Sequence, residues 1–147
     1  MTDLNVDDFF RDAARTLVAL YAVFPRRHAI FVDDIYAEEE PDEFGLHSER
    51  YQACFGTLLW LAEEDYLRFD DTVRNEAIDQ AVLTGRCFTL LSSRGGKVSA
   101  ADPELPEPVR LEHETHIHQI RTALKKRYST DLRIAMLDLM SRMEAIG

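Results

Sequence analysis

The chain has 147 residues and a formal net charge of −10; 46% of its residues are apolar and 30% are charged. This length suits one ordinary domain, or a small domain with an appendage, and the apolar content argues against disorder of the whole chain. No stretch approaches the roughly 18 uncharged apolar residues of a membrane-spanning helix. The two cysteines are too few for a disulfide scaffold and fit a reducing compartment. We therefore expect a cytoplasmic protein that does not enter a membrane.

Charge and composition both divide the chain. Residues 1–80 hold 19 acidic and 7 basic side chains, whereas residues 81–147 hold 8 acidic and 10 basic ones. Residues 92–108 contain two glycines and three prolines and show no apolar periodicity, which is typical of a linker. We therefore predict an N-terminal domain, a linker and a C-terminal helical extension over residues 1–93, 94–108 and 109–147, respectively.

The first predicted element is a helix. Residues 6–23 carry apolar side chains three and four positions apart, which predicts a helix. Pro25 ends it, because a proline disfavours helical geometry in the residue before it. Residues 28–37 are too few to assign by periodicity alone, and the spacing of their apolar side chains fits a short helix.

The middle of the chain predicts a long helix followed by a hairpin. Ser48 is a candidate N-cap for the helix, which continues along a broad apolar stripe. Residues 66–69 and 77–83 have the composition of two strands joined by turn residues at 70–76. Thr84 is a candidate cap of a further short helix. The sequence thus predicts a mainly α-helical fold with a small β-hairpin.

Two more helices are predicted after the linker, one over residues 109–128 and a last one capped by Ser129 or Thr130. The last helix has the strongest periodicity in the chain, and its apolar stripe is rich in methionine, which adapts well to irregular contacts. That stripe must be covered either by its own domain or by another chain. If a second copy covers it, the homo-oligomer interface would consist of Ile117, Ile120, Leu124, Leu132, Met136, Leu139, Met140 and Met143.

The order helix, short helix, long helix, hairpin and helix resembles a winged helix-turn-helix domain over about residues 6–93, and so do the phrases LLWLAEEDYLRFDD and AVLTGRCFTLL. The resemblance implies that the third helix, SERYQACFGTLL, would enter the major groove of DNA and that RFDDTVRNEAI would form a wing against the backbone. On that alternative, the nucleic-acid contacts would come from Arg50, Gln52, Arg68 and Arg74.

The local charge argues against DNA as the ligand. Those two elements contain three cations, at Arg50, Arg68 and Arg74, and acids flank each of them. A strong DNA binder makes roughly six to ten phosphate contacts, most of which need a cation. We therefore predict a non-enzymatic module for protein interaction and assembly, which forms a homo-oligomer and can take a further protein partner. A dimeric winged-helix transcription regulator that binds DNA is the alternative.

No motif predicts catalysis, a metal or a cofactor, so an enzyme is only a third hypothesis. His113 and His116 lie three apart in the predicted helix, but two ligands alone hold a metal weakly, and a helix–helix contact is the preferred interpretation. Cys54 and Cys87 lie on apolar stripes and are expected in the core. Asp33, Asp34 and the acids at residues 38–40 could be magnesium ligands or paired acid–base carboxylates, but the preferred interpretation is a solvated face that would attract a basic partner.

Overall fold

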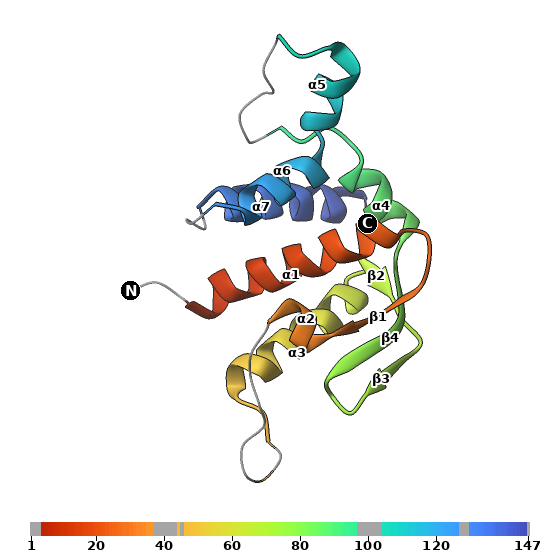
Figure 1. The fold of residues 1–147 in the computed structure, drawn as a ribbon, viewed down its shortest axis with the longest axis vertical. Helices are drawn as coiled ribbons and strands as arrows, with labels where there is room; N and C mark the ends of the chain where they lie inside the picture. Colours follow the sequence, from red (N-terminus) through yellow and green to blue (C-terminus); the bar gives the residue numbers. More distant parts are fainter. Residues whose placement is uncertain (1–3, 37–43, 45, 97–103, 127–129, 147) are drawn as a thin grey trace. The chain divides into compact units, whose positions relative to one another are not determined.

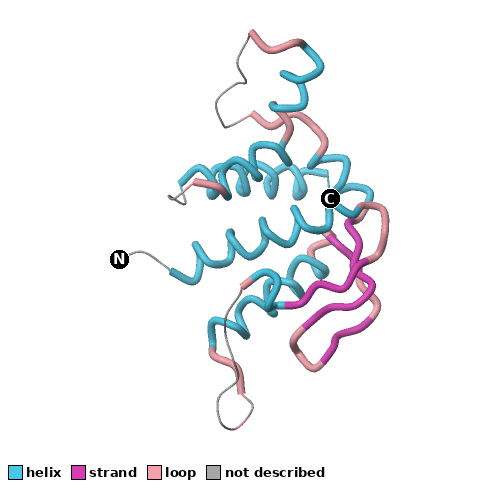
Figure 2. Tube along the Cα trace, in the orientation of Figure 1, coloured by secondary structure: helices cyan, strands magenta, loops and turns pink. Residues whose placement is uncertain are grey.

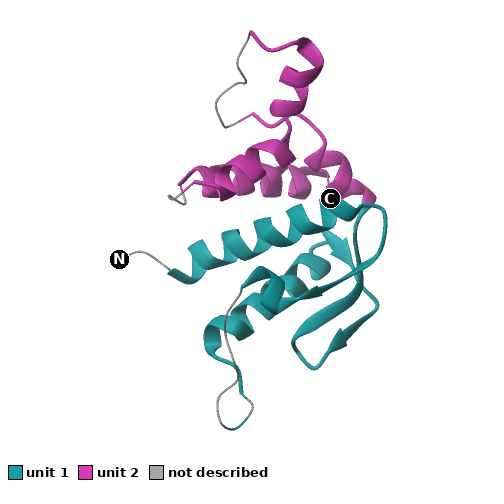
Figure 3. Ribbon diagram, in the orientation of Figure 1, with its two compact units in different colours: residues 1–84 teal, residues 85–147 magenta. Residues whose placement is uncertain are grey.

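The computed structural model describes residues 4–36, 44, 46–96, 104–126 and 130–146. Within these residues it has seven α-helices and one small antiparallel sheet of four strands (Figures 1 and 2), which confirms the predicted mainly α-helical class. The chain divides into two compact units (Figure 3): unit 1 is Met1–Thr84 and unit 2 is Gly85–Gly147.

Unit 1 is built around two long helices, α1 (Leu4–Val23) and α3 (Glu49–Glu63), which pack against each other. The predicted start of α3 is confirmed, because the hydroxyl of Ser48 accepts a hydrogen bond from the backbone N–H of Tyr51 at 3.2 Å. The apolar stripes predicted for both helices form the core between them. Its fully buried members are Ala13, Ala14, Leu17, Tyr51, Cys54, Leu58 and Leu61.

The predicted short helix over residues 28–37 is wrong in its first half. His28–Phe31 form strand β1, and helix α2 occupies only Val32–Ile35. Strand β1 pairs with β4 (Ala77–Leu83) in antiparallel register, with Ile30 opposite Ile78. The strand partner lies far along the chain, so local spacing of apolar residues could not identify it.

Strand β4 is the centre of the sheet, and the predicted hairpin is confirmed. β2 (Leu67–Arg68) and β3 (Asp71–Val73) both pair with β4 on the side away from β1. The expected turn over residues 70–76 is shorter than predicted. Arg74 and Asn75 form its tip with φ values of 52° and 57°, as in the tight turns that match the twist of a hairpin.

Unit 2 consists of four helices: α4 (Gly85–Leu91), α5 (Glu107–His113), α6 (His116–Leu124) and α7 (Thr130–Ile146). Helix α4 packs on α6 and α7, and its Cys87 and Leu91 are fully buried there. The division between the units therefore falls before α4, whereas we expected the N-terminal domain to extend to residue 93. Of the predicted linker, residues 97–103 lie outside the described residues.

The single helix predicted over residues 109–128 is broken at Glu114 and Thr115. The hydroxyl of Thr115 accepts from the N–H of His118 at 3.3 Å and so caps the start of α6. The backbone of the preceding loop fills the break: Gly95 N–H donates to the carbonyl of Glu114, and His116 N–H donates to that of Ser93, both at 2.8 Å. These non-local hydrogen bonds stabilise a break that the apolar spacing of the helix did not predict.

We expect Leu58→Ala to destabilise unit 1 by about 2–5 kcal/mol, because the side chain is fully buried and its removal leaves a cavity. Chemical denaturation followed by the fluorescence of Trp60 reports this loss, since Trp60 is the single tryptophan and lies in α3. The exposed Glu63→Ala on the same helix is the control, and we expect a change below about 0.5 kcal/mol. Equal effects of the two substitutions would contradict the packing described.

Candidate functional site

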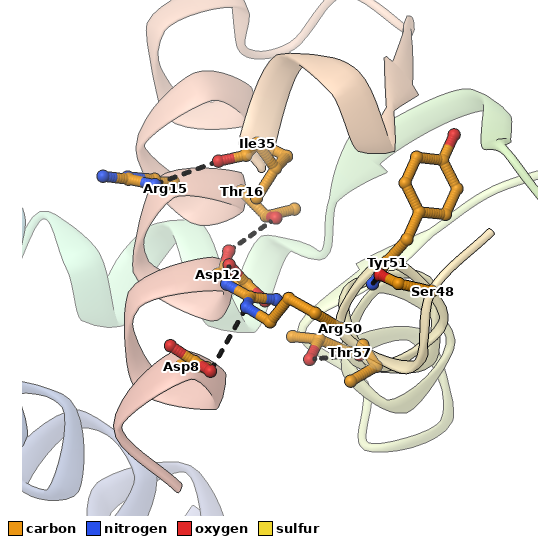
Figure 4. A network of polar contacts seen from close by, with 10 residues as sticks. Asp8, Asp12, Arg15, Thr16, Ile35, Ser48, Arg50, Tyr51 and Thr57 are labelled. Atoms are coloured by element: carbon orange, nitrogen blue, oxygen red, sulfur yellow. Dashed lines mark hydrogen bonds and ion pairs between the residues drawn. The ribbon is translucent and has the colours of Figure 1, made fainter. Parts of the chain in front are cut away.

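A buried ion pair joins the two long helices of unit 1 (Figure 4). Asp12 lies on the inner face of α1 and is only 1% exposed. Arg50, in the first turn of α3, donates to both of its carboxylate oxygens, from Nη1 to Oδ2 at 2.7 Å and from Nη2 to Oδ1 at 2.8 Å. This bidentate geometry is the strongest form of an arginine–carboxylate contact. Its two parallel hydrogen bonds hold the guanidinium in one orientation.

Two further contacts fix the same guanidinium. Arg50 Nε lies 3.2 Å from Oδ2 of Asp8, one turn before Asp12 on α1. The guanidinium carbon also lies 4.2 Å from the ring centre of Tyr36, in cation–π geometry. The hydrogen bond to Asp12, assisted by the charges of Asp12 and Asp8, outweighs the effect of burial and raises the pKa of Arg50 above its ordinary value. Arg50 is therefore a permanent internal cation.

A pocket of about 350 Å³ opens beside this ion pair. Helices α1 and α3 contribute four lining residues each: Asn5, Asp8, Phe9 and Asp12 from α1, and Glu49, Arg50, Ala53 and Thr57 from α3. We call it the α1–α3 pocket. Its three carboxylates and one guanidinium give it a formal charge of −2, so the pocket has the electrostatics of a cation site.

The four residues assigned to DNA contact lie in different environments in unit 1. The guanidinium of Arg50 is held by Asp12 and Asp8. Gln52 donates from Nε2 to the carbonyl of His47 at 3.0 Å. Arg68 on β2 and Arg74 in the β3–β4 turn are exposed.

Asp12 is the residue of this site that sequence interpretation missed. It lies among the apolar residues of the buried stripe of α1, between Phe10 and Ala13. A carboxylate in such a stripe is the available signal, since acids are almost never fully buried unless they are paired. Its partner, 38 residues further along the chain, could not be identified from spacing.

The side chains assigned to a homo-oligomer interface are covered within their own chain. Ile117 and Ile120 of α6 are buried, and so are Leu132, Met136, Leu139 and Met143 of α7. Helices α4 and α6 both pack on α7. Leu124 and Met140 are half-buried. Most of the methionine-rich stripe is thus buried within the chain, and its contact with a second copy stays a prediction.

A second polar cluster lies in the core of unit 2. His116 at the start of α6 is 1% exposed, and its Nδ1 lies 3.7 Å from Oδ2 of Asp138 on α7. Asp138 accepts hydrogen bonds from the N–H of Gly96 at 3.1 Å and from Nε of Arg142 at 3.2 Å. Neither ring nitrogen of His116 has a hydrogen-bond partner among the described residues. The cluster ties the loop before α5 to α7 and leaves a buried imidazole beside Asp138.

The predicted pairing of His113 with His116 on one helical face is wrong, because the break at residues 114–115 places them on different helices. His113 instead stacks on His118, with ring centres 4.3 Å apart. In the part of the chain that the structure describes, no group of three His, Cys, Asp or Glu side chains is arranged to hold a metal ion. Cys54 and Cys87 are buried as predicted, and burial raises the pKa of each thiol to about 12.

We expect unit 2 to lose stability as the pH falls below 6.5. Burial lowers the pKa of His116 against the attraction of Asp138, and burial together with His113 lowers that of His118. A histidine whose folded pKa lies below its unfolded value of 6.5 stabilises the fold above that pH, and the stabilisation is lost on acidification. The lowered pKa of Asp138 acts only below its ordinary value of 3.8, outside this range.

Amide hydrogen exchange of α6 and α7 at pH 7 and pH 5 measures this effect. The His116→Gln variant separates the contribution of His116 from that of His118. The protection factors of its amides, which correct for the pH dependence of intrinsic exchange, should change less between pH 7 and pH 5 than those of the unmodified chain. An identical pH dependence in both proteins would contradict the assignment to His116.

Over the residues that the structure describes, we find no helix with the length and hydropathy of a membrane span. No protein-family model, curated protein or solved structure matches this chain.

Proposed function

We propose that the chain is a non-enzymatic interaction module whose unit 1 docks a basic segment of another protein. The observation that carries this proposal is the sequestration of Arg50. It is the one cation of α3, and Asp12 and Asp8 hold it against α1. The exposed surface of α3 therefore presents the carboxylates of Glu49 and Glu63, with no basic side chain of the same helix to compensate them.

The net charge of unit 1 supports the same partner chemistry. Its 84 residues include 19 acids and 7 bases, a formal charge of −12. A surface of one sign attracts partners of the opposite sign and raises their association rate, and it repels polyanions. A lysine- or arginine-rich protein segment fits this field.

Binding to DNA as a dimeric winged-helix regulator is the second candidate. The observation in its favour is the order of elements in unit 1: a helix, a short helix, a long helix and a hairpin, with β1 before the short helix. The local charge argues against DNA binding, because Arg50 is paired with Asp12. Exposed cations such as Arg68 and Arg74 would have to make the phosphate contacts instead.

Fluorescence polarisation of the full chain with three labelled probes separates the two candidates. The probes are an eight-residue peptide of alternating arginine and glycine, the same peptide with citrulline in place of arginine, and a random 20-base-pair duplex. We expect saturable one-to-one binding of the arginine peptide that persists near physiological ionic strength, where the Debye length is about 8 Å, and no binding of the other probes. Tighter binding of the duplex would favour the regulator, and binding of no probe would contradict docking of a basic segment.

A further inference from the structure

We propose that the α1–α3 pocket receives the guanidinium group of an arginine side chain from the basic partner. This inference rests on the proposed function and names the point of contact. The pocket lies between the first half of α1 and the first half of α3, where Asp8, Asp12 and Glu49 line it together with Arg50.

The pocket is lined mainly by hydrogen-bond acceptors, which favour a ligand that donates hydrogen bonds. Arg50 uses three of its five N–H donors, one from each nitrogen, on Asp12 and Asp8. Thr57 donates its hydroxyl proton to the carbonyl of Ala53 at 3.0 Å, which leaves its oxygen as an acceptor. An anionic ligand would therefore meet three carboxylates and one guanidinium whose charge is already paired with Asp12 and Asp8.

Acceptor capacity remains after these internal contacts are made. An ionised carboxylate offers about four lone-pair positions. Arg50 uses two on Asp12 and one on Asp8, and the Cys54 thiol takes a further one on Asp12. Glu49 is exposed at the start of α3 and makes no hydrogen bond or ion pair with the residues that the structure describes. Asp12 lines the pocket although it is almost completely buried. Its carboxylate oxygens therefore lie in a partly desolvated environment, which strengthens charge-assisted hydrogen bonds.

The size and the walls of the pocket select a side chain rather than a bare ion. Its volume of about 350 Å³ lies at the lower end of the range of roughly 300–1,000 Å³ for small-ligand sites. Phe9 and Ala53 give it apolar wall that suits the aliphatic stem of an arginine, and the ring of Phe9 can also take a cation on its face. The planar fork of a guanidinium carries five donors, against three on the ammonium group of lysine, and so matches carboxylates on two helices better.

The first test is a titration followed by NMR on the uniformly ¹⁵N-labelled full chain. N-acetyl-arginine amide is the ligand, and N-acetyl-citrulline amide, which has the same shape without the charge, is the control. We expect saturating shifts of the backbone amides of residues 5–9 and 49–53 with the arginine compound and none with the citrulline compound. Shifts confined to other residues, or equal shifts with both compounds, would overturn the assignment.

The second test uses variants with the arginine–glycine peptide. Glu49→Gln removes one charge from the rim and should weaken binding by about threefold to fivefold, as expected for an exposed charge pair. Ala53→Leu fills the pocket without changing the charge, at an exposed position of a helix where leucine is well tolerated, and should weaken binding by about tenfold or more. Glu144→Gln removes the same charge from an exposed position of α7, outside unit 1, and should leave binding within about twofold of the unmodified chain.

The outcomes separate the pocket from the proposed function. If the peptide binds the unmodified chain and both pocket variants equally, the pocket assignment is overturned and docking by the acidic surface stands. If the peptide does not bind but N-acetyl-arginine amide shifts the pocket amides, the pocket assignment stands and the docking proposal fails. Circular dichroism of each variant checks that the fold is retained.

Discussion

Replacing Asp12 with alanine is expected to destabilise unit 1 by about 3 kcal/mol. Removal of one partner from a buried ion pair typically costs about 3–5 kcal/mol, because the remaining charge stays in a poorly solvated place. We expect the lower end of that range, because the side chain of Arg50 is 21% exposed to solvent and still contacts Asp8. Chemical denaturation followed by Trp60 fluorescence measures the change, because Trp60 lies in α3 and its ring packs against that of Phe9 on α1, with ring centres 5.1 Å apart.

Asp8→Ala is the matched control for this prediction. It removes a carboxylate from the same helix and from the same arginine, but the Asp8 side chain is 40% exposed, and exposed ion pairs contribute only about 0–1 kcal/mol. The double variant Asp12→Ala/Arg50→Ala should be less destabilised than the sum of its single variants, because no unpaired charge remains. A loss for Asp12→Ala no greater than that for Asp8→Ala would show that Arg50 does not depend on the buried pair.

Replacing Met136 with aspartate is expected to unfold unit 2. The side chain is fully buried between α7 and its neighbours, and its truncation alone would cost about 2–5 kcal/mol. A carboxylate at the same place adds the penalty of a buried charge, which amounts to several kcal/mol more. Typical domains are stable by only about 5–15 kcal/mol. Loss of amide protection in α6 and α7 measures the effect directly.

Leu137→Asp tests whether the effect belongs to the buried stripe. Leu137 is the next residue on α7 and is 50% exposed, so the same substitution there should change stability by no more than about 0.5 kcal/mol. Light scattering adds a second measurement. If Met136→Asp instead kept the fold and only lowered the molecular mass of an oligomer, the stripe would be an interface between copies after all.

Local sequence signals predicted much of the fold. The N-cap at Ser48, the end of α1 before Pro25 and the apolar stripe of α7 all depend on residues within a few positions of one another. The strand pair around Arg74 and Asn75 was also predictable, because both residues belong to a short run of turn-forming composition. These features are governed by the energetics of one helical turn or one hairpin.

Contacts between distant segments escaped prediction. His28–Phe31 become a strand because β4 lies beside them, and α6 begins at His116 because the backbone of Ser93 and Gly95 hydrogen-bonds into the break. The candidate site has the same origin, since Asp12 and Arg50 meet only after α1 and α3 pack. Of that site, the sequence indicated the acidic charge but not the pocket.

By itself, the sequence determined the helical class, the main helix boundaries and the acidic character of the first 84 residues, because periodicity, capping and charge are local or additive properties. Only the tertiary structure decided which charges are available. It pairs Arg50 with Asp12 inside unit 1 and buries most of the methionine stripe of α7, because burial depends on what packs against a side chain and not on its neighbours in the chain.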